Sequence, residues 1–318
     1  MHVIVLLVGL ALVVFGADWL VDGASSIARK ARISEFVIGM TIVGFGTSCP
    51  ELVVSLTGAL EGSPAISAGN VIGSNIFNVL LILGLTALIS PVAVTYPNKR
   101  RDIPVMLLVT FLFAFTGYSK TFLGIGKFDD VSIVEGVVFL VLFAIYLYYC
   151  FKCGKDDSAS EPAARAMKLP LAILLVLAGL AGLVFGGQMF VDNAVIIARS
   201  LGVSEKFIAV TLLAGGTSLP ELATCVVAIA KHKDALALGN ILGSNVFNIL
   251  LILGVSAIAG GGMHLSDITA VDMCALLLSA VLVWMCTYTG RKDRIDRWEG
   301  AIFLLVFAAY YVWLFMKL

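Results

Sequence analysis

The stretch Gly46-Thr47-Ser48-Cys49-Pro50-Glu51 occurs a second time, nearly unchanged, as Gly216-Thr217-Ser218-Leu219-Pro220-Glu221. Each copy places a proline and a carboxylate inside a long apolar segment. A charged side chain at mid-membrane costs roughly 3 kcal/mol even on lenient insertion scales, so such residues are rare and usually functional. Two of them, at matching places in the two halves of the chain, predict a paired cation site.

The composition around these motifs is that of a membrane protein. The chain has 318 residues, of which 60% are hydrophobic and 13% are charged, and its mean hydropathy is +1.04. Soluble domains are usually about half apolar and a quarter charged. We therefore expect an all-α membrane protein whose main partner is the lipid bilayer. The net charge of zero gives no bulk attraction to nucleic acid, and no sequence feature indicates an enzyme, a cofactor or an obligatory protein partner.

Ten segments are long and apolar enough to approach the roughly 20 residues that a spanning helix needs. They predict ten transmembrane helices, arranged as a first five-helix repeat over 1–151, a cytoplasmic linker over 152–169 and a second repeat over 170–318. The ten segments are 3–20, 36–60, 66–89, 103–118, 131–150, 171–190, 207–230, 235–259, 270–288 and 298–316.

The distribution of lysine and arginine predicts the orientation. With ten helices, 16 of the 21 basic residues fall in loops on one side of the membrane and 5 on the other. Because basic loops stay in the cytoplasm, both termini are expected to face outward across the inner (plasma) membrane of the cell. A missed or extra helix would scramble this bias.

An internal repeat extends well beyond the first motif. Residues 37–89 align with 207–259 at a constant offset of 170, and 22 of the 53 positions are identical. Five helices per repeat is an odd number, so the second copy must enter the membrane from the opposite side. Such inverted-topology repeats are common in secondary transporters, which bind their substrates near the midplane.

The proline of each copy should disturb its helix. Pro50 lacks a backbone donor and pushes against the carbonyl of Gly46, as Pro220 does against that of Gly216. The kinks should loosen carbonyls over 44–47 and 214–217, beginning at Gly44 and Ala214. Loosened carbonyls in the membrane are tolerated where they meet protein, water or an ion.

Helical spacing places hydroxyl groups beside each carboxylate. Glu51 follows Thr47 by four residues and Ser48 by three, so the three side chains share one face. Glu221, Thr217 and Ser218 repeat the arrangement. Carboxylates, hydroxyls and carbonyls form an all-oxygen site, which Ca²⁺ prefers. Two glutamates match the charge of one Ca²⁺ or two Na⁺. A single protonated glutamate beside a proline kink is the structural alternative.

A second motif, Gly69-Asn70-x-x-Gly73-Ser74-Asn75-x-Phe77-Asn78, recurs as Gly239-Asn240-x-x-Gly243-Ser244-Asn245-x-Phe247-Asn248. Its asparagines and serines either coordinate an ion or hydrogen-bond between helices. We favour coordination for Ser74 and Asn78 and for Ser244 and Asn248, because the two residues of each pair are four apart and share one helix face. We favour interhelical packing for Asn70, Asn75, Asn240 and Asn245.

Taken together, the two motifs resemble the alpha repeats of the calcium/cation antiporter superfamily, and most closely those of the prokaryotic sodium/calcium exchangers. The resemblance covers nearly the whole chain. It implies export of Ca²⁺ in exchange for Na⁺ by alternating access, with the first and sixth helices sliding over the core. Glu51 and Glu221 would bind Ca²⁺, helped by the Thr47 and Thr217 carbonyls. The sodium sites would use Ser48, Ser218, Ser74, Ser244 and the Gly44 and Ala214 carbonyls, with Asn78 and Asn248 in the middle.

One position departs from part of that superfamily. Several members, including the potassium-dependent branch, carry aspartate where this chain has Asn248. We therefore expect exchange without potassium. The fixed charge stays at −2, so exchange of three Na⁺ for one Ca²⁺ would move one net charge and respond to membrane potential.

Three other functions remain as alternatives. A proton-coupled calcium antiporter would typically carry glutamate where Gly73 and Gly243 stand. An uncoupled channel would pass calcium without a counter-ion. A structural membrane protein would leave Glu51 and Glu221 unexplained.

Overall fold

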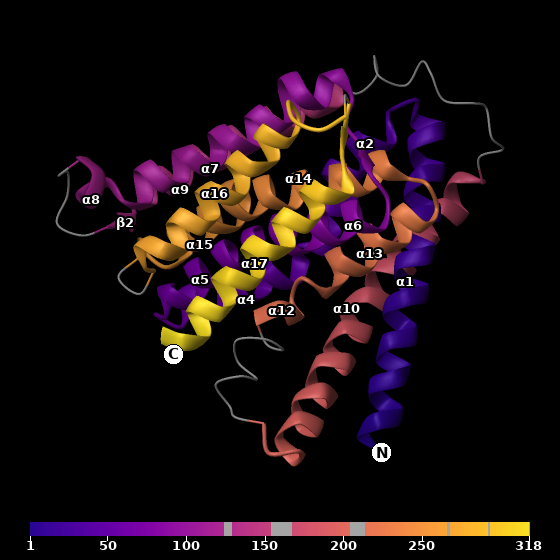
Figure 1. Cartoon of the computed structure of the whole chain (residues 1–318), viewed down its shortest axis with the longest axis horizontal. Helices are drawn as coiled ribbons and strands as arrows, with labels where there is room; N and C mark the ends of the chain where they lie inside the picture. The colour runs from indigo at the N-terminus through magenta and orange to yellow at the C-terminus, as the bar shows by residue number, and fades with distance from the viewer. Residues whose placement is uncertain (124–128, 154–166, 204–213, 266–267, 292, 318) are drawn as a thin grey trace. The chain divides into compact units, whose positions relative to one another are not determined.

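The computed structural model describes residues 1–318 except for 124–128, 154–166, 204–213, 266–267, 292 and 318 (Figure 1). The described chain is mainly helical and divides into two compact units. Unit 1 comprises Met1–Ser48, Cys150–Gly243 and Leu305–Leu318, and unit 2 comprises Cys49–Tyr149 and Ser244–Leu304. Each unit draws on both halves of the sequence. The division into repeats at 152–169 remains a prediction, and most of that linker lies outside the described residues.

By length and composition, six described helices can cross a membrane. A seventh span results if the helical stretches Glu35–Thr47 and Cys49–Leu60 count as one interrupted helix. Every one of the ten predicted segments contains helix, although 207–213 lie outside the described residues. A crossing by all ten remains a prediction. The six spans are His2–Ala31, Pro64–Ile89, Ile133–Lys152, Leu169–Ser200, Asp234–Ala259 and Arg297–Met316.

The helices repeat at the offset found in the sequence. Each of the following pairs is separated by 170 residues at its start: α4 (Cys49–Leu60) and α13 (Leu219–Ala230), α5 (Pro64–Ile76) and α14 (Asp234–Phe247), α6 (Gly84–Ile89) and α15 (Gly254–Ala259). The π-helix η2 (Phe77–Leu83) lies between α5 and α6, and the π-helix η6 (Asn248–Leu253) lies between α14 and α15. η2 begins one residue before Asn78, and η6 begins at Asn248. Short π segments are frequent at functional sites.

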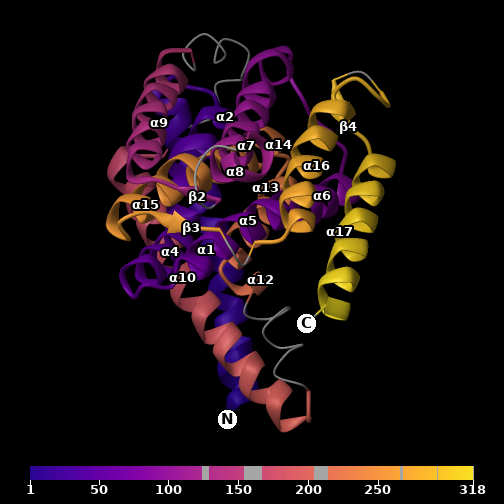
Figure 2. The same ribbon diagram turned by 90° about the vertical axis from the view of Figure 1, so that its left-hand side faces the viewer.

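Unit 1 is built on two long helices, α1 (His2–Ala31) and α10 (Leu169–Ser200), which run side by side (Figures 1 and 2). A Cβ atom added at Gly9 would lie 2.8 Å from the Gly186 carbonyl oxygen, and one at Gly16 would lie 2.8 Å from that of Gly179. The contacts run in opposite directions along the two helices, so the pair is antiparallel. Both helices extend about ten residues beyond the predicted segments 3–20 and 171–190.

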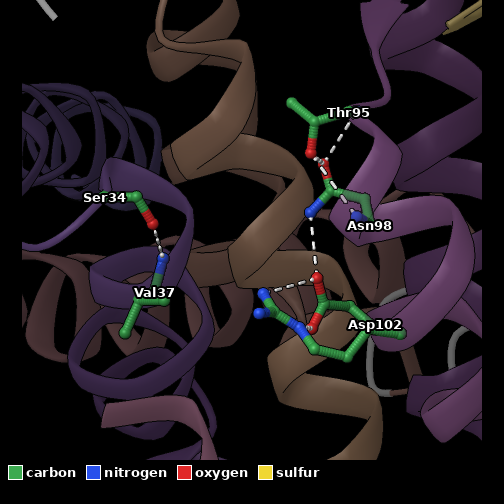
Figure 3. Close-up of polar contacts among 6 residues, drawn as sticks. Ser34, Val37, Thr95, Asn98 and Asp102 are labelled. Atoms are coloured by element: carbon green, nitrogen blue, oxygen red, sulfur yellow. Dashed lines mark hydrogen bonds and ion pairs between the residues drawn. The ribbon is translucent and has the colours of Figure 1, made fainter. Parts of the chain in front are cut away.

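The remainder of unit 1 carries the first part of each Gly-Thr-Ser motif. The hydroxyl of Ser34 caps α2 (Glu35–Ile38) by accepting a hydrogen bond of 3.3 Å from the Val37 amide (Figure 3). The π-helix η1 (Gly39–Val43) and α3 (Gly44–Thr47) follow, and α12 (Ala214–Gly216) is the short helix before α13. Both helices break at the motif serine. Ser48 has φ −85 and ψ 6, and Ser218 has φ −89 and ψ 7.

In unit 2, two short strand pairs join the first half of the sequence to the second. Strand β1 (Val92–Ala93) pairs antiparallel with β4 (Arg294–Ile295), and β2 (Asp130–Val131) pairs with β3 (Met263–His264). Each pair joins a strand of the first half to one of the second. The remaining helices of this part are η3 (Asn98–Asp102), α7 (Ile103–Gly117), α8 (Ser119–Leu123), α9 (Ile133–Cys153), α16 (Ala270–Cys286) and α17 (Arg297–Lys317), of which α9 and α17 continue into unit 1.

Candidate cation site

In unit 2, Glu51 is held between α4 and α5. Glu51 is only 1% exposed. The Ser74 hydroxyl donates a hydrogen bond of 3.4 Å to Glu51 Oε1. The Asn70 amide nitrogen donates to the Glu51 carbonyl at 3.1 Å and to the Ser55 hydroxyl at 2.9 Å. These bonds fix the two helices around the carboxylate. They also confirm the interhelical role predicted for Asn70.

The asparagines of unit 2 form a second buried polar group. Asn248 Nδ2 donates to Asn75 Oδ1 at 2.9 Å, and Asn75 Nδ2 donates to the Asn245 carbonyl at 3.3 Å. Asn75 therefore joins η6 and α14 to α5, as its predicted packing role requires. Asn78 and Asn248 are each 1% exposed, and neither Oδ1 atom has a hydrogen-bond partner among the described residues. A buried polar atom left without a partner costs about 1–3 kcal/mol, which a cation would remove.

In unit 1, Glu221 lies near the start of α13 and is also 1% exposed. The Ser48 hydroxyl donates a hydrogen bond of 3.0 Å to Glu221 Oε1. Thr47 Oγ1 donates to Asn240 Oδ1 at 3.2 Å, so a second hydroxyl of the first motif meets a residue of the second half. The structure thus brings the first Gly-Thr-Ser motif to the second glutamate.

The predicted loosening of backbone carbonyls is only partly seen. The Gly44 carbonyl accepts a hydrogen bond of 3.1 Å from the Ser48 amide, and Thr47 Oγ1 lies at donor distance, 3.5 Å, from the same oxygen. The helix break at Ser48 therefore does not strip Gly44 of its backbone partner, contrary to the simple expectation from Pro50. Ala214 begins α12, and Thr217 is half-buried beside the fully buried Ser218.

The predicted site residues thus fall into two groups. Among the described residues, no three His, Cys, Asp or Glu side chains are grouped so that they could hold a metal ion. Each group instead supplies one carboxylate with hydroxyl, amide and carbonyl oxygens. The approach of Glu51 to Glu221 remains a prediction. Unit 2 holds Glu51, Ser74, Asn78, Ser244 and Asn248, and unit 1 holds Gly44, Thr47, Ser48, Ala214, Thr217, Ser218 and Glu221.

Sequence reasoning missed an ion-pair cluster on α1. Lys231 Nζ lies 2.7 Å from Asp18 Oδ1 and 2.7 Å from Asp22 Oδ1. Arg29, which is nearer to Asp22 along the chain, pairs instead with Glu35, with 3.7 Å between Arg29 Nη1 and Glu35 Oε1. Glu35 also pairs with Lys233 at 2.6 Å. No local signal in the sequence points to Lys231, because 209 or more positions separate it from Asp22 and Asp18.

Comparison with known proteins identifies the family of the chain. The family model described as sodium/calcium exchanger protein matches residues 1–152 and 171–316. A putative antiporter, CaxA, from Alkalimonas amylolytica is 40% identical, and the sodium/calcium exchanger MaX1 from Methanosarcina acetivorans is 31% identical; each match covers 98% of both chains.

A solved structure of the sodium-calcium exchanger NCX_Mj, soaked without Na⁺ and Ca²⁺, superposes with a TM-score of 0.84 at 36% sequence identity. The match covers 98% of both chains. The family match, the full-length relatives and the fold all point to a multi-pass membrane transporter and not to an enzyme. This chain belongs to the sodium/calcium exchanger family.

Proposed function

We propose that this chain exports Ca²⁺ from the cell in exchange for Na⁺ by alternating access. One observation carries the proposal: a hydroxyl from the first Gly-Thr-Ser motif, Ser48, bonds to the buried carboxylate of the second, Glu221. The matched Glu51 is equally buried and receives Ser74. In a chain of this family, two buried acidic residues surrounded by hydroxyl and amide groups are suited to bind transported cations.

The chemistry of these groups suits Ca²⁺ and Na⁺. Both are hard cations, and Ca²⁺ takes six to eight oxygen ligands at about 2.3–2.6 Å. Glu51 and Glu221 would supply the charge for Ca²⁺, with the Thr47 and Thr217 carbonyls. Sodium would use the serine hydroxyls and the outer carbonyls. The amide oxygens of Asn78 and Asn248 would complete the middle of the site. The proposed sodium ligands are Ser48, Ser218, Ser74, Ser244, Gly44 and Ala214.

The glycine contacts between α1 and α10 support alternating access. The two backbones approach closely at Gly9 and Gly16, where an added Cβ atom would meet backbone atoms of α10. We propose that the two helices move together as one gate between inward-open and outward-open states, within ten helices arranged as two inverted repeats. Both termini would lie outside the inner membrane.

The proposed coupling follows from charge. Asn78 and Asn248 are neutral, so Glu51 and Glu221 set the fixed charge at −2. Exchange of three Na⁺ for one Ca²⁺ then moves one positive charge per cycle. Such exchange needs no potassium and responds to membrane potential.

The test is uptake of radioactive calcium into proteoliposomes that contain the purified chain. We expect uptake driven by an outward sodium gradient, unchanged by potassium and faster when the vesicle interior is made positive, because three Na⁺ leave for each Ca²⁺ that enters. Uptake driven only by a pH gradient would establish proton coupling instead. Calcium entry without any counter-ion gradient would establish a channel.

Two variants test the assignment of the glutamates. Glu51→Gln and Glu221→Gln keep the side-chain size and remove one charge each, so both should abolish exchange while the protein still folds. Glu61→Gln, on an exposed turn after α4, is the matched control and should exchange normally. Normal exchange by either buried variant would show that the assignment of that glutamate is wrong.

A further inference from the structure

In unit 1 a chain of hydrogen bonds links a candidate calcium ligand to a buried thiol. Thr47 Oγ1 donates to Asn240 Oδ1 at 3.2 Å, and Asn240 Nδ2 donates to Cys225 Sγ at 3.3 Å. The Cys225 thiol in turn donates to the Ala237 carbonyl at 3.7 Å. Thr47, Asn240 and Cys225 are each 0% exposed, so bulk water does not compete for these bonds. The chain of bonds therefore ties Thr47, at the end of α3, to the helix that carries Glu221.

The same construction occurs in unit 2, displaced by 170 positions in the sequence. Asn70 Nδ2 donates to the Ser55 hydroxyl at 2.9 Å, and that hydroxyl donates to the Ser67 carbonyl at 3.5 Å. In chain order, the matching residues of the second half are Cys225, Ala237 and Asn240. Because both halves build these bonds, the joint between α4 and α5 and the joint between α13 and α14 belong to the architecture of the repeat.

The comparison of the two joints settles which way the Asn240 amide points. Asn70 Nδ2 also donates to the Glu51 carbonyl at 3.1 Å. A carbonyl only accepts hydrogen bonds, so it is the nitrogen of Asn70 that faces α4. Asn240 Nδ2 faces α13 in the same way and leaves Oδ1 to accept from the Thr47 hydroxyl. Cys225 thus holds the amide in the orientation that presents an acceptor to Thr47.

The two joints differ in one atom. Unit 2 has the hydroxyl of Ser55 where unit 1 has the thiol of Cys225. Sulfur is a weak hydrogen-bond acceptor and a thiol is a weak donor. The joint of unit 1 therefore holds its asparagine less firmly than the joint of unit 2 does.

The segment that leads to Thr47 rests on the helix that carries Asn240. A Cβ atom added at Gly239, the neighbour of Asn240, would overlap the Phe36 carbonyl oxygen. The backbone of α2 therefore lies directly against that of α14. With the two backbones in contact, a change in the orientation of the Asn240 amide acts on Thr47 through their hydrogen bond.

We propose that Cys225 is a positioning residue for calcium binding: through Asn240 it sets the position of Thr47 without touching the ion. The inference rests on the proposed function, in which the Thr47 carbonyl is a calcium ligand. Without the thiol, the Asn240 nitrogen loses a partner and the amide is free to turn. Thr47 then loses its acceptor, and the carbonyl of the same residue is held less well for the ion.

The test is the calcium concentration for half-maximal sodium-driven uptake into proteoliposomes that contain the full chain. Cys225→Ala should raise this concentration about fivefold, which corresponds to one ordinary neutral hydrogen bond, with little change in the maximal rate. Cys225→Ser supplies a hydroxyl, as Ser55 does in unit 2, and should restore the value of the unaltered chain.

A control variant separates positioning from a general loss of stability. Ile229 lies one turn beyond Cys225 on α13 and is 3% exposed. Ile229→Ala should lower the thermal midpoint at least as much as Cys225→Ala and leave the half-maximal calcium concentration unchanged. The proposal would be overturned by an unchanged concentration in Cys225→Ala, by a Cys225→Ser variant as weak as Cys225→Ala, or by an equal shift in Ile229→Ala.

A double variant tests the route through Thr47. Thr47→Val removes the hydroxyl and so interrupts the chain of bonds at its other end. Residues that act through one network are not additive, so adding Cys225→Ala to Thr47→Val should have little further effect on the half-maximal calcium concentration. Full addition of the two single effects would show that Cys225 does not act through Thr47.

Calcium binding can be measured apart from exchange, as the rise in thermal midpoint that calcium causes in detergent, because an ion that binds only the folded state stabilises it. Neither a rise nor exchange in the unaltered chain would refute the proposed function. Both in the unaltered chain, with the same calcium dependence in Cys225→Ala, would refute only the role of Cys225.

Discussion

Ser48 and Glu221, 173 positions apart in the sequence, are joined by a hydrogen bond of 3.0 Å from the serine hydroxyl to Oε1 of the carboxylate. Both residues are buried. Ser48 is also where the helix between α3 and α4 breaks, so the break aims this hydroxyl at the acidic residue of the other half. The bond connects the backbone irregularity of one motif to the charge of its copy.

We predict that Ser48→Ala weakens calcium binding about tenfold or more. A hydrogen bond to a charged group contributes about 1.5–3 kcal/mol, and its loss leaves a buried carboxylate less well solvated. The measurement is the apparent calcium affinity in vesicle exchange, with helical content as a check of folding. Ser200→Ala is the control, because that hydroxyl donates to the Ile197 carbonyl at an exposed helix end. Equal affinities in the two variants would contradict the prediction.

Asn75 should act as a positioning residue for Asn248. Its Oδ1 accepts from Asn248 Nδ2, which turns the Asn248 oxygen toward the interior. We predict that Asn75→Ala raises the calcium concentration for half-maximal exchange severalfold, with a smaller change in maximal rate. Asn245→Ala is the matched control, because Asn245 occupies the corresponding place in the repeat and its side chain donates instead to Met106 Sδ at 3.6 Å. An equal or larger effect at Asn245 would show that Asn75 has no special role.

The charge argument is tested at Asn248 itself. Asn248→Asp would add one negative charge to the proposed site while keeping its shape. We predict that calcium is still bound but that exchange becomes sensitive to pH or potassium, because the extra charge requires another monovalent cation. Exchange measured across pH and potassium concentration provides the test. An unchanged profile would weaken the link between fixed charge and coupling.

The sequence predicted the repeat well because helix starts and the π-helical segments follow the motifs. The offset of 170 residues recurs in α4 and α13 and in α6 and α15. Helix ends were harder to predict, since α1 continues through Asp18 and Asp22 to Ala31. Lys231 pairs with both carboxylates, and a contact across 209 or more residues leaves no local signal.

For the candidate site, too, the sequence predicted some features and not others. The helical spacing of Glu51 with Thr47 and Ser48 suggested that all three act together. In the structure Ser48 instead donates a hydrogen bond to Glu221 and Thr47 donates one to Asn240, because the helix breaks between these residues and Glu51. Motif composition identified the polar residues, but their partners depend on where the backbone turns.

The glycine contact between α1 and α10 gives a prediction about stability. A methyl group at Gly16 would lie 2.8 Å from the Gly179 carbonyl oxygen, so Gly16→Ala must push the helices apart. We expect a loss of about 1–3 kcal/mol in stability, as in other overpacked sites, together with slower exchange. Gly187→Ala on α10 is the control, because a methyl group there meets no atom within 4 Å. Removing a helical glycine should leave Gly187→Ala equally or more stable. The thermal midpoints of both variants decide between these outcomes.

The last prediction concerns the ion pairs of Lys231 with Asp18 and Asp22. The repeat does not reproduce this lysine: the residue 170 positions before Lys231 is Glu61, while Asp22 corresponds to Asp192. Burial lowers the pKa of Lys231, but hydrogen bonds to Asp18 and Asp22 outweigh it and raise the pKa above its usual value of 10.5. Because the folded pKa is raised, the stabilisation is complete below the unfolded value and is lost as the pH rises through the folded one.

Lys231→Met should therefore cost at most about 1 kcal/mol, since Asp18 and Asp22 are more than a third exposed and solvent screens their charges. Its effect on the gate should be clearer than its effect on stability. Without the lysine, α1 is no longer tied to the turn after α13, so the balance between the two access states should shift. Labelling of single cysteines on each side of the membrane measures that balance, and Lys30→Met, an exposed lysine at the end of α1, serves as the control. An access balance that is the same in both variants would show that Lys231 does not hold the gate.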